Sequence, residues 1–155
     1  MVFCQMGIAL KACSLSLELF FGTLLHGEGV KVGVLFDVFV GPSLVDLYAK
    51  CCEMELAERV FVYMDKKNVV SWNALLNGYA LKGDAGKVFN LFQGMAESEL
   101  RCSKFTLSNV LKSCTYLGNL TWGLIAHSLV IMTGCEHDEF VGCCLLDMHS
   151  KCGLS

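Results

Sequence analysis

The sequence predicts an all-α fold, an α-solenoid of stacked helical hairpin repeats, and three observations carry this prediction. The first is an internal repeat with a fixed offset of 101 residues, which pairs Phe39 with Phe140 and Lys50 with Lys151. The second is that apolar residues recur at helical spacing, whereas the period-two alternation of strands is missing. The third is that glycines stand where the helical segments stop. One hairpin cannot bury both of its faces, so hairpins of this kind stack.

The 101-residue cycle divides into three shorter repeats, whose lengths are 35, 31 and 35 residues. Four complete repeats span residues 3–37, 38–68, 69–103 and 104–138, and a partial repeat spans 139–155. Each complete repeat is long enough for two helices and the turns that join them. We therefore expect one repeat array with eight or nine antiparallel helices and no β-sheet.

In repeat 3–37, two apolar stripes at helical spacing predict two helices. The first stripe comprises Met6, Ala9, Leu10 and Cys13, and the second comprises Leu17, Phe20, Phe21, Leu24 and Leu25. Gly27, Gly29 and Gly33 follow the second stripe, and glycine disfavours helix continuation. The second helix is therefore expected to weaken along this stretch and to end in it.

In repeat 38–68, Pro42 predicts the start of a helix, because its missing N–H costs little in a first turn. The turn is expected near Cys51 and Cys52. The two apolar stripes comprise Leu44, Val45, Leu47 and Tyr48, and then Leu56, Ala57, Val60, Phe61 and Met64.

Repeats 69–103 and 104–138 carry clear stop and cap signals. Gly83 predicts a helix end and Asp84 the cap of the next helix; Gly118 and Asn119 repeat this plan, and Gly134 ends the last helix. The stripes comprise Trp72, Leu75, Leu76 and Tyr79; Val88, Leu91, Phe92 and Met95; Leu107, Val110, Leu111 and Cys114; and Leu120, Leu124, His127 and Ile131. His26 and His127 are expected to pack within second helices and not to act as ligands.

Composition limits the classes of function. The formal net charge is −3, whereas nucleic-acid-binding domains usually present a basic face. Ten cysteines include no C-x-x-C pair, and several occupy equivalent repeat positions, which favours packing of reduced thiols over disulfides or metal ligation. Charged residues interrupt every apolar run before it reaches the length of a membrane span, so no membrane partner is expected.

Two families of helical hairpins have repeats near this length. Trp72, Leu75 and Tyr79 fit the tetratricopeptide pattern W-x2-L-G-x2-Y, although a leucine replaces the glycine, and Ala85 with Phe89 fits its A-x3-F. This resemblance implies a protein-protein interaction scaffold that binds peptides. A constant-length tetratricopeptide array does not account for the cycle of 35, 31 and 35 residues.

The pentatricopeptide repeat family is the closer resemblance. Residues 69–79 resemble the opening of its repeat, and residues 37–51 resemble the short repeat of its plant PLS subclass. Residues 11–13 and 112–114 are similar to the L type of that subclass. The resemblance covers residues 3–155 in the order L, S, P, L and partial S.

This resemblance implies sequence-specific binding of single-stranded RNA in a plant mitochondrion or chloroplast, most often to select sites for C-to-U RNA editing. One repeat of the family reads one base. No cofactor is implied and no enzyme is expected. The H-x-E form of residues 137–139 lacks the P-C-x-x-C that a zinc deaminase needs, so an editing deaminase or other editing factors would be supplied in trans.

Carried over to this sequence, the fifth and last residues of the P repeat are Asn73 and Ser103, and the family's code for this pair leans to cytosine before uracil. Val70 and Phe105 would flank that base through apolar contact and stacking. Taken alone, Asn73 is equally a solvated polar residue of a first helical turn and Ser103 a helix cap.

The neighbouring repeats offer fewer reading side chains. Ser108 and Asp138 occupy the two reading positions of the second L repeat, and Pro42 and Asn68 those of the S repeat. Proline has no side-chain hydrogen bond to give. For Ser108, Asp138 and Asn68, base reading and a purely structural role stay open as alternatives. A tetratricopeptide-like scaffold and a truncated fragment without function remain the alternative interpretations of the whole chain.

Overall fold

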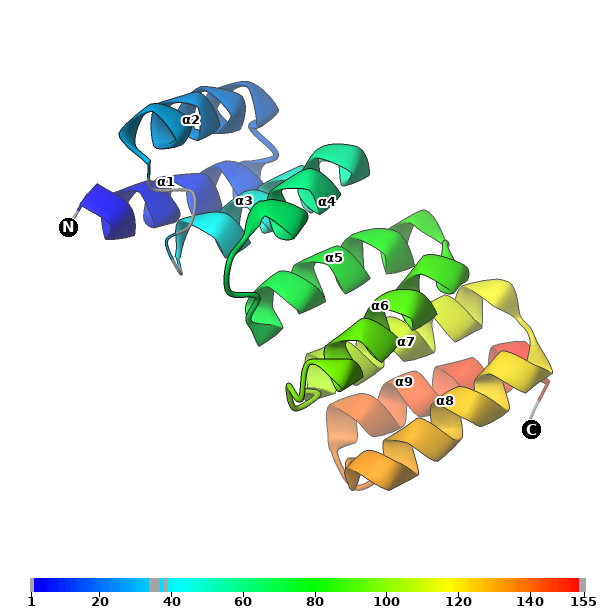
Figure 1. Cartoon of the computed structure of the whole chain (residues 1–155). Coiled ribbons are helices and arrows are strands. Elements are labelled where there is room, and N and C mark those ends of the chain that lie inside the picture. Colours follow the sequence, from blue (N-terminus) through cyan, green and yellow to red (C-terminus); the bar gives the residue numbers. More distant parts are fainter. Residues whose placement is uncertain (1, 34–36, 38, 154–155) are drawn as a thin grey trace. The chain divides into compact units, whose positions relative to one another are not determined.

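The structure, a computed structural model, describes residues 2–33, 37 and 39–153. In these ranges the chain folds into nine α-helices and contains no strand (Figure 1). They are α1 (Val2–Ser16), α2 (Leu19–Val32), α3 (Val40–Lys50), α4 (Met54–Tyr63), α5 (Val69–Lys82), α6 (Ala85–Glu97), α7 (Lys104–Leu117), α8 (Leu120–Thr133) and α9 (Glu139–Cys152). The predicted all-α fold of helical hairpins is confirmed, and each of the four complete predicted repeats holds a pair of helices, although α1 begins one residue before the first repeat.

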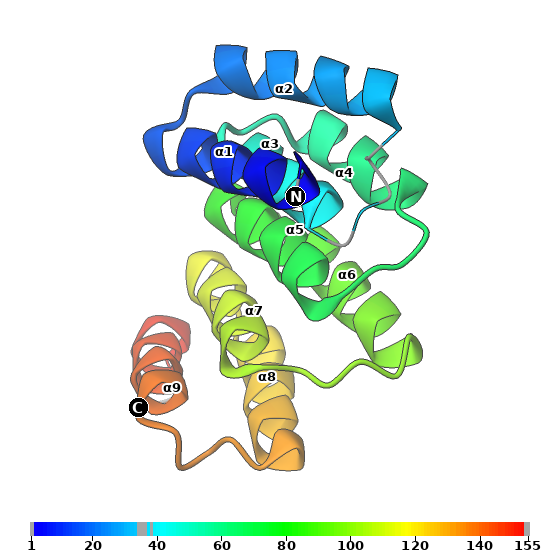
Figure 2. The same ribbon diagram turned by 90° about the vertical axis from the view of Figure 1, so that its left-hand side faces the viewer.

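The chain forms two compact units, Met1–Gly78 and Tyr79–Ser155, which divide within α5. In the first unit α1 packs along α3, α4 packs against α3, and α2 contacts both α1 and α3. In the second unit α7 packs along α9, while α6 and α8 contact α7, as Figures 1 and 2 show. The most extensive contact in each unit therefore joins the first helices of two successive repeats.

Apolar side chains of the first helices form the core of each unit and are shielded almost completely from solvent, as expected for residues that drive helix packing. From the predicted stripes these include Leu10, Leu44, Val45, Leu47 and Tyr48 in the first unit and Leu107, Val110, Leu111 and Cys114 in the second. Val40, Val141 and Met148 join them, whereas Met6, Ala9 and Cys13 of the stripe predicted for α1 are only partly buried.

The predicted stop and cap signals are also confirmed. Gly83, Gly118 and Gly134 follow α5, α7 and α8 with φ angles of 79°, 58° and 71°. This left-handed region favours glycine, so the helices end there. The side chains of Asp84 and Asn119 accept backbone N–H hydrogen bonds at the starts of α6 and α8, over 3.1 and 2.9 Å.

The predicted end of the second helix was wrong in part. α2 continues through Gly27 and Gly29 as far as Val32, and ends at Gly33 with a φ of 77°. Gly22 and Gly29 are both buried, and a Cβ on Gly22 would collide with the Leu47 side chain of α3. Here glycine permits a close approach between helices, and tertiary packing outweighs its low helix propensity.

The predicted buried face was also wrong for the second helices of the predicted repeats 3–37 and 104–138. In α2, Phe20 and Leu24 are 69% and 52% exposed, and in α8, Leu124 and Ile131 are 51% and 56% exposed. The buried positions instead carry small side chains or Val: Gly22 and Gly29 in α2, and Gly123, Ala126 and Val130 in α8.

None of the described helices has the length and apolar character needed to cross a bilayer.

The expected packing role of His26 and His127 is supported by their contacts. His26 Nδ1 lies 2.6 Å from the Tyr48 hydroxyl, and burial lowers the pKa of His26 and raises that of Tyr48. At the equivalent place 101 residues later, the His127 ring meets the His149 ring edge to face, with centroids 4.8 Å apart.

Candidate functional site

The last residue of each complete predicted repeat accepts backbone hydrogen bonds at the start of the next helix, as the N-cap residue at Asn68, Ser103 and Asp138 and two residues before the N-cap Phe39 at Asp37. The side chains of Asp37, Asn68, Ser103 and Asp138 each accept a hydrogen bond from a backbone N–H two or three residues later, over 2.8, 2.9, 3.3 and 3.0 Å. These bonds satisfy donors that a helix start leaves without an intrahelical partner. The helix-cap interpretation of Ser103 is thereby confirmed. A base contact at Asn68 or Asp138 would use the second polar atom of the side chain, Nδ2 or Oδ2.

Two of these caps are reciprocal, a feature that was not predicted from the sequence. The backbone N–H of Asn68 donates to Ser71 Oγ over 3.1 Å, and that of Ser103 donates to Thr106 Oγ1 over 3.1 Å. The spacing of the polar residues could have predicted these bonds, because the two residues of each pair lie three positions apart at a helix start, as in a capping box. The reciprocal bonds fix the direction in which α5 and α7 leave the preceding loop.

An exposed apolar side chain occupies the second position of each repeat for which that position is described. Phe39, Val70, Phe105 and Phe140 are 58%, 61%, 56% and 42% exposed. An isolated exposed apolar side chain is ordinary, but its recurrence at one repeat position is a regular feature of this chain. We call these four the second-position residues; Phe39 and Val70 belong to the first compact unit, and Phe105 and Phe140 to the second.

In the second compact unit the two second-position residues form an aromatic pair. The Phe105 and Phe140 rings lie with their centroids 5.9 Å apart and their planes tilted by 56°. The Lys104 ammonium group lies 5.7 Å from the centroid of the Phe105 ring. Asp138 caps α9 two residues before Phe140, so a carboxylate stands beside the same pair. Aromatic faces, a cation and a hydrogen-bonding side chain are thus gathered at the starts of α7 and α9.

Asn73 is part-exposed in the second turn of α5, three residues after the exposed Val70. Its neighbours Trp72 and Leu75 are 7% and 0% exposed, so Asn73 lies off the buried stripe, as its position predicts. Asn73 belongs to the first compact unit and Ser103 to the second, and each is described within its own unit.

Ser108 differs from the other candidate residues because it is only 3% exposed. Its hydroxyl donates to the Phe105 carbonyl oxygen over 2.9 Å, which is a common way for serine to satisfy its hydroxyl within a helix. A base contact through Ser108 would require this hydroxyl to turn away from Phe105 and reach the surface.

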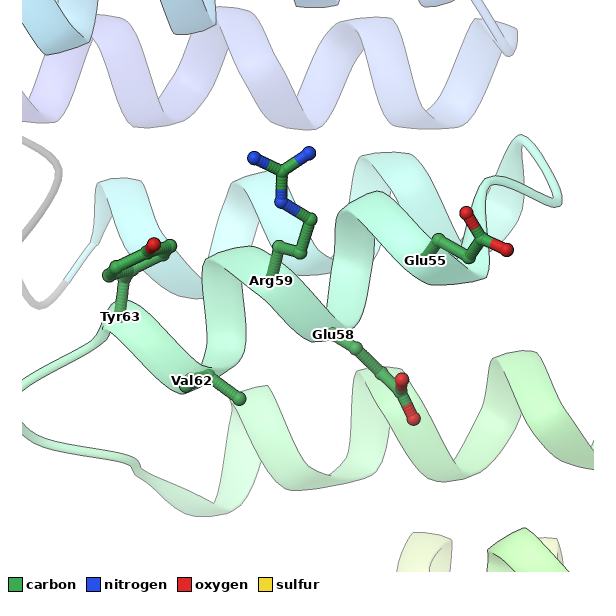
Figure 3. Close-up of a pocket in the computed structure, with 5 residues that line it drawn as sticks. All are labelled: Glu55, Glu58, Arg59, Val62 and Tyr63. Carbon is green, nitrogen blue, oxygen red and sulfur yellow. The ribbon is translucent and has the colours of Figure 1, made fainter.

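No part of the described chain brings three or more His, Cys, Asp or Glu side chains together in a way that would hold a metal ion. A hollow on α4 has a volume of about 370 Å³ and is lined by Glu55, Glu58, Arg59, Val62 and Tyr63 (Figure 3). In Figure 3 the side chains of Arg59 and Glu58 point to opposite sides of the helix. All five residues come from one helix and none belongs to the candidate set, so this hollow is separate from the candidate site.

Comparison with known proteins identifies relatives of the chain. A sequence model described as the PPR repeat family matches residues 67–115, and one described as the PPR repeat matches residues 43–69. Among curated relatives in Arabidopsis thaliana, a mitochondrial pentatricopeptide repeat-containing protein is 38% identical over 96% of this chain, and a second is 35% identical over 93%. A chloroplastic one is 39% identical over 93% of this chain. The chain spans 14%, 16% and 23% of the lengths of these three proteins.

Proposed function

Because the chain belongs to the pentatricopeptide repeat family, we propose that it binds single-stranded RNA in a plant mitochondrion or chloroplast as part of organelle RNA processing. The observation that supports this proposal is the set of second-position residues, whose apolar side chains stay exposed at the starts of α3, α5, α7 and α9. Bases stack on exposed aromatic faces whatever their sequence, and a nearby cation attracts the phosphates. Phe105, Phe140 and Lys104 supply these features in the second compact unit.

We further propose the PLS subclass, with the repeat boundaries 3–37, 38–68, 69–103 and 104–138 and a partial repeat at 139–155. The cycle of 35, 31 and 35 residues supports this division, and the helix pairs fall within it. In this subclass the chain would recognise sites for C-to-U RNA editing. The deaminase or other editing factors would then act in trans.

The proposed base-binding residues are Asn73, Ser103, Val70, Phe105, Ser108, Asp138 and Asn68. Asn73 and Ser103 read one pyrimidine, with cytosine preferred, and Val70 and Phe105 flank it. Asp138 acts beside the Phe105 and Phe140 rings, whereas Ser108 contributes only if its hydroxyl is released from the helix. In the S repeat, Asn68 stands alone, because Pro42 offers no side-chain hydrogen bond.

A protein-interaction scaffold is the second candidate function, and the exposed apolar faces of α2 and α8 favour it. Labelled single-stranded RNA pools and acidic C-terminal peptides, measured against the chain at one stated salt concentration, separate the two. We expect RNA binding that weakens as salt rises and that the peptides do not displace. Peptide binding with no RNA competition would establish the scaffold instead. If neither ligand binds, the chain is a fragment without function of its own.

A further inference from the structure

The outward face of α8 is apolar over the length of the helix and carries no charge. Five large side chains on it are between 42% and 81% exposed: Leu120, Leu124, Ile125, Ile131 and Met132. The helix contains no Asp, Glu, Lys or Arg. Its buried residues are the small or β-branched ones, and α8 contacts α7 and α9. A contiguous exposed apolar face of this kind marks an interaction surface.

The equivalent helix of the first unit differs in charge. α2 also exposes large apolar side chains, but Glu28 and Lys31 are exposed on the same helix and pair with each other over 3.0 Å. Covering these two groups would strip water from an ion pair, which is costly. The outward face of α8 has no such group, so it can be covered without burying a charge.

The polar side chain in the middle of the α8 face is already satisfied. Ser128 is exposed, and its hydroxyl donates to the Leu124 carbonyl oxygen over 3.0 Å. A hydroxyl that is bonded within its own helix loses little when water is removed from around it. The centre of the face is therefore suited to a dry contact.

The outward side chains are arranged symmetrically about Ser128. Leu124 and Met132 lie four residues to either side of it, and Ile125 and Ile131 lie three residues to either side. Residues at these spacings share one face of a helix. A twofold axis that passes through Ser128, perpendicular to the helix, would set each of the four against an apolar side chain of a second copy.

We propose that this face is a self-association surface, on which α8 of a second copy lies antiparallel with Ser128 at the twofold axis. The small serine side chains let the two helices approach, and the four larger side chains fill the space on either side. No like charges meet across the contact, although each chain carries a net charge of −3. Two helices of 14 residues bury less than the roughly 800 Å² per partner of a standard interface, so the dimer is weak and exchanges rapidly.

Two other occupants fit this face less well. Helices that lie on membranes use Lys and Arg to attract anionic lipids, and α8 has neither. A charged peptide would find no opposite charge on the helix. The proposal does not rest on RNA binding, because no residue of α8 belongs to the proposed base-binding residues.

The test measures sedimentation equilibrium of the full chain, without RNA and with reductant present, from micromolar to near-millimolar concentration. We expect a monomer–dimer equilibrium. Ser128→Glu and Ser128→Lys each place two like charges at the axis and should raise the dissociation constant at least about tenfold. An equimolar mixture of the two variants should dimerise again, because glutamate then faces lysine. Circular dichroism checks that the exposed substitutions leave the helices intact.

Gly27→Glu is the matched control. Gly27 stands 101 residues before Ser128, in α2, and a Cβ there meets nothing within 4 Å, so this charge should leave the dissociation constant unchanged. The proposal is overturned if the natural chain stays monomeric throughout, whether or not it then co-sediments with phosphatidylcholine vesicles. It is also overturned if the two Ser128 variants dimerise as well as the natural chain, or if their mixture stays monomeric.

Discussion

Single residues at the predicted repeat boundaries stabilise helix starts, so a test of their proposed role in binding must separate stability from affinity. Ser103 caps α7 through its hydroxyl, and Asp138 caps α9 through its carboxylate. A substitution that removes the cap therefore changes stability as well as recognition. Informative variants are those that exchange one capping side chain for another.

Ser103→Asp is such a variant, because aspartate caps helices about as well as serine. We expect it to shift the preference of the P repeat from cytosine toward uracil, following the code of the family, with little change in stability. The affinity is measured with RNAs that differ at one base, using the chain grafted between well-behaved repeats. Ser103→Ala is the control and should lose about 1 kcal/mol of stability with the cap. An unchanged base preference in Ser103→Asp would remove Ser103 from the site.

Asn73→Ala tests the other half of the proposed pair. Asn73 is part-exposed and lies off the buried stripe of α5, so the truncation should leave the core intact. We expect a loss of roughly 1–3 kcal/mol at the cognate base, the scale of one specific base contact. Asn77→Ala, one turn further along the same helix, is the matched control. Equal binding of all four bases before and after the change would make Asn73 a surface polar group.

His26 gives a pH-dependent prediction at the same scale. Burial lowers the pKa of His26 in the folded chain, so its neutral form is favoured there. The stability that depends on neutral His26 is present above the unfolded pKa near 6.5 and is lost as pH falls through the lower folded pKa. We expect the unfolding midpoint of the natural chain to fall between pH 7.5 and 5 by more than that of His26→Gln. Parallel pH profiles for the two chains would contradict this.

At the scale of the helix, the sequence predicted first helices well and second helices less well. The stripe of α3, with Leu44, Leu47 and Tyr48, was read correctly because large apolar side chains mark its buried face. In α2 and α8 the large side chains point outward, and the close contact is made by small residues such as Gly22 and Ala126. The pattern of large apolar side chains does not reveal such a face, because the residues that make the close contact are small and are not strongly hydrophobic.

Gly22 and Gly27 of α2 provide a matched pair of variants. A Cβ on Gly22 would collide with Leu47, whereas a Cβ on Gly27 meets nothing within 4 Å. We expect Gly22→Ala to destabilise the chain by about 1–3 kcal/mol through overpacking. Gly27→Ala should stabilise it by roughly 0.5–1 kcal/mol, since alanine favours the helix. Chemical unfolding measures both, and equal effects of the two changes would contradict the close approach of α2 to α3.

The candidate site was predictable only in part, for reasons that differ between residues. The position of Asn73 off the buried stripe followed from the repeat frame, whereas the recurrence of Phe105 at its repeat position was equally compatible with core packing, which its exposure contradicts. The burial of Ser108 did not, because a serine satisfied by its own helix has the same sequence pattern as a serine that faces a ligand. The approach of Lys104 to the Phe105 ring also depends on rotamers that the sequence leaves open.

For the whole molecule, charge and length both limit affinity for RNA. The chain carries a net charge of −3 and spans 14–23% of the lengths of the three relatives described above. A negative chain gains little from the release of counterions by RNA, and few repeats give few base contacts. Further repeats in a longer protein would add base contacts.

Neutralising three exposed glutamates tests how much the net charge limits the affinity for RNA. Glu55→Gln, Glu97→Gln and Glu99→Gln together bring the formal net charge from −3 to 0. We expect affinity to rise by the same factor for every RNA sequence, because long-range attraction carries no base information. Fluorescence anisotropy at two salt concentrations measures the change. A gain confined to one base would show that these residues act locally and not through the field of the molecule.

The caps at Asn68, Ser103 and Asp138 also restrict how a chain of this design can evolve. Under the proposed function, a mutation at such a position changes both the start of a helix and the contact with a base. Asparagine, aspartate, serine and threonine keep the cap, whereas bulky apolar residues lose it. A change of base specificity at these positions is therefore limited to exchanges among these four residue types, each of which leaves the helix start intact.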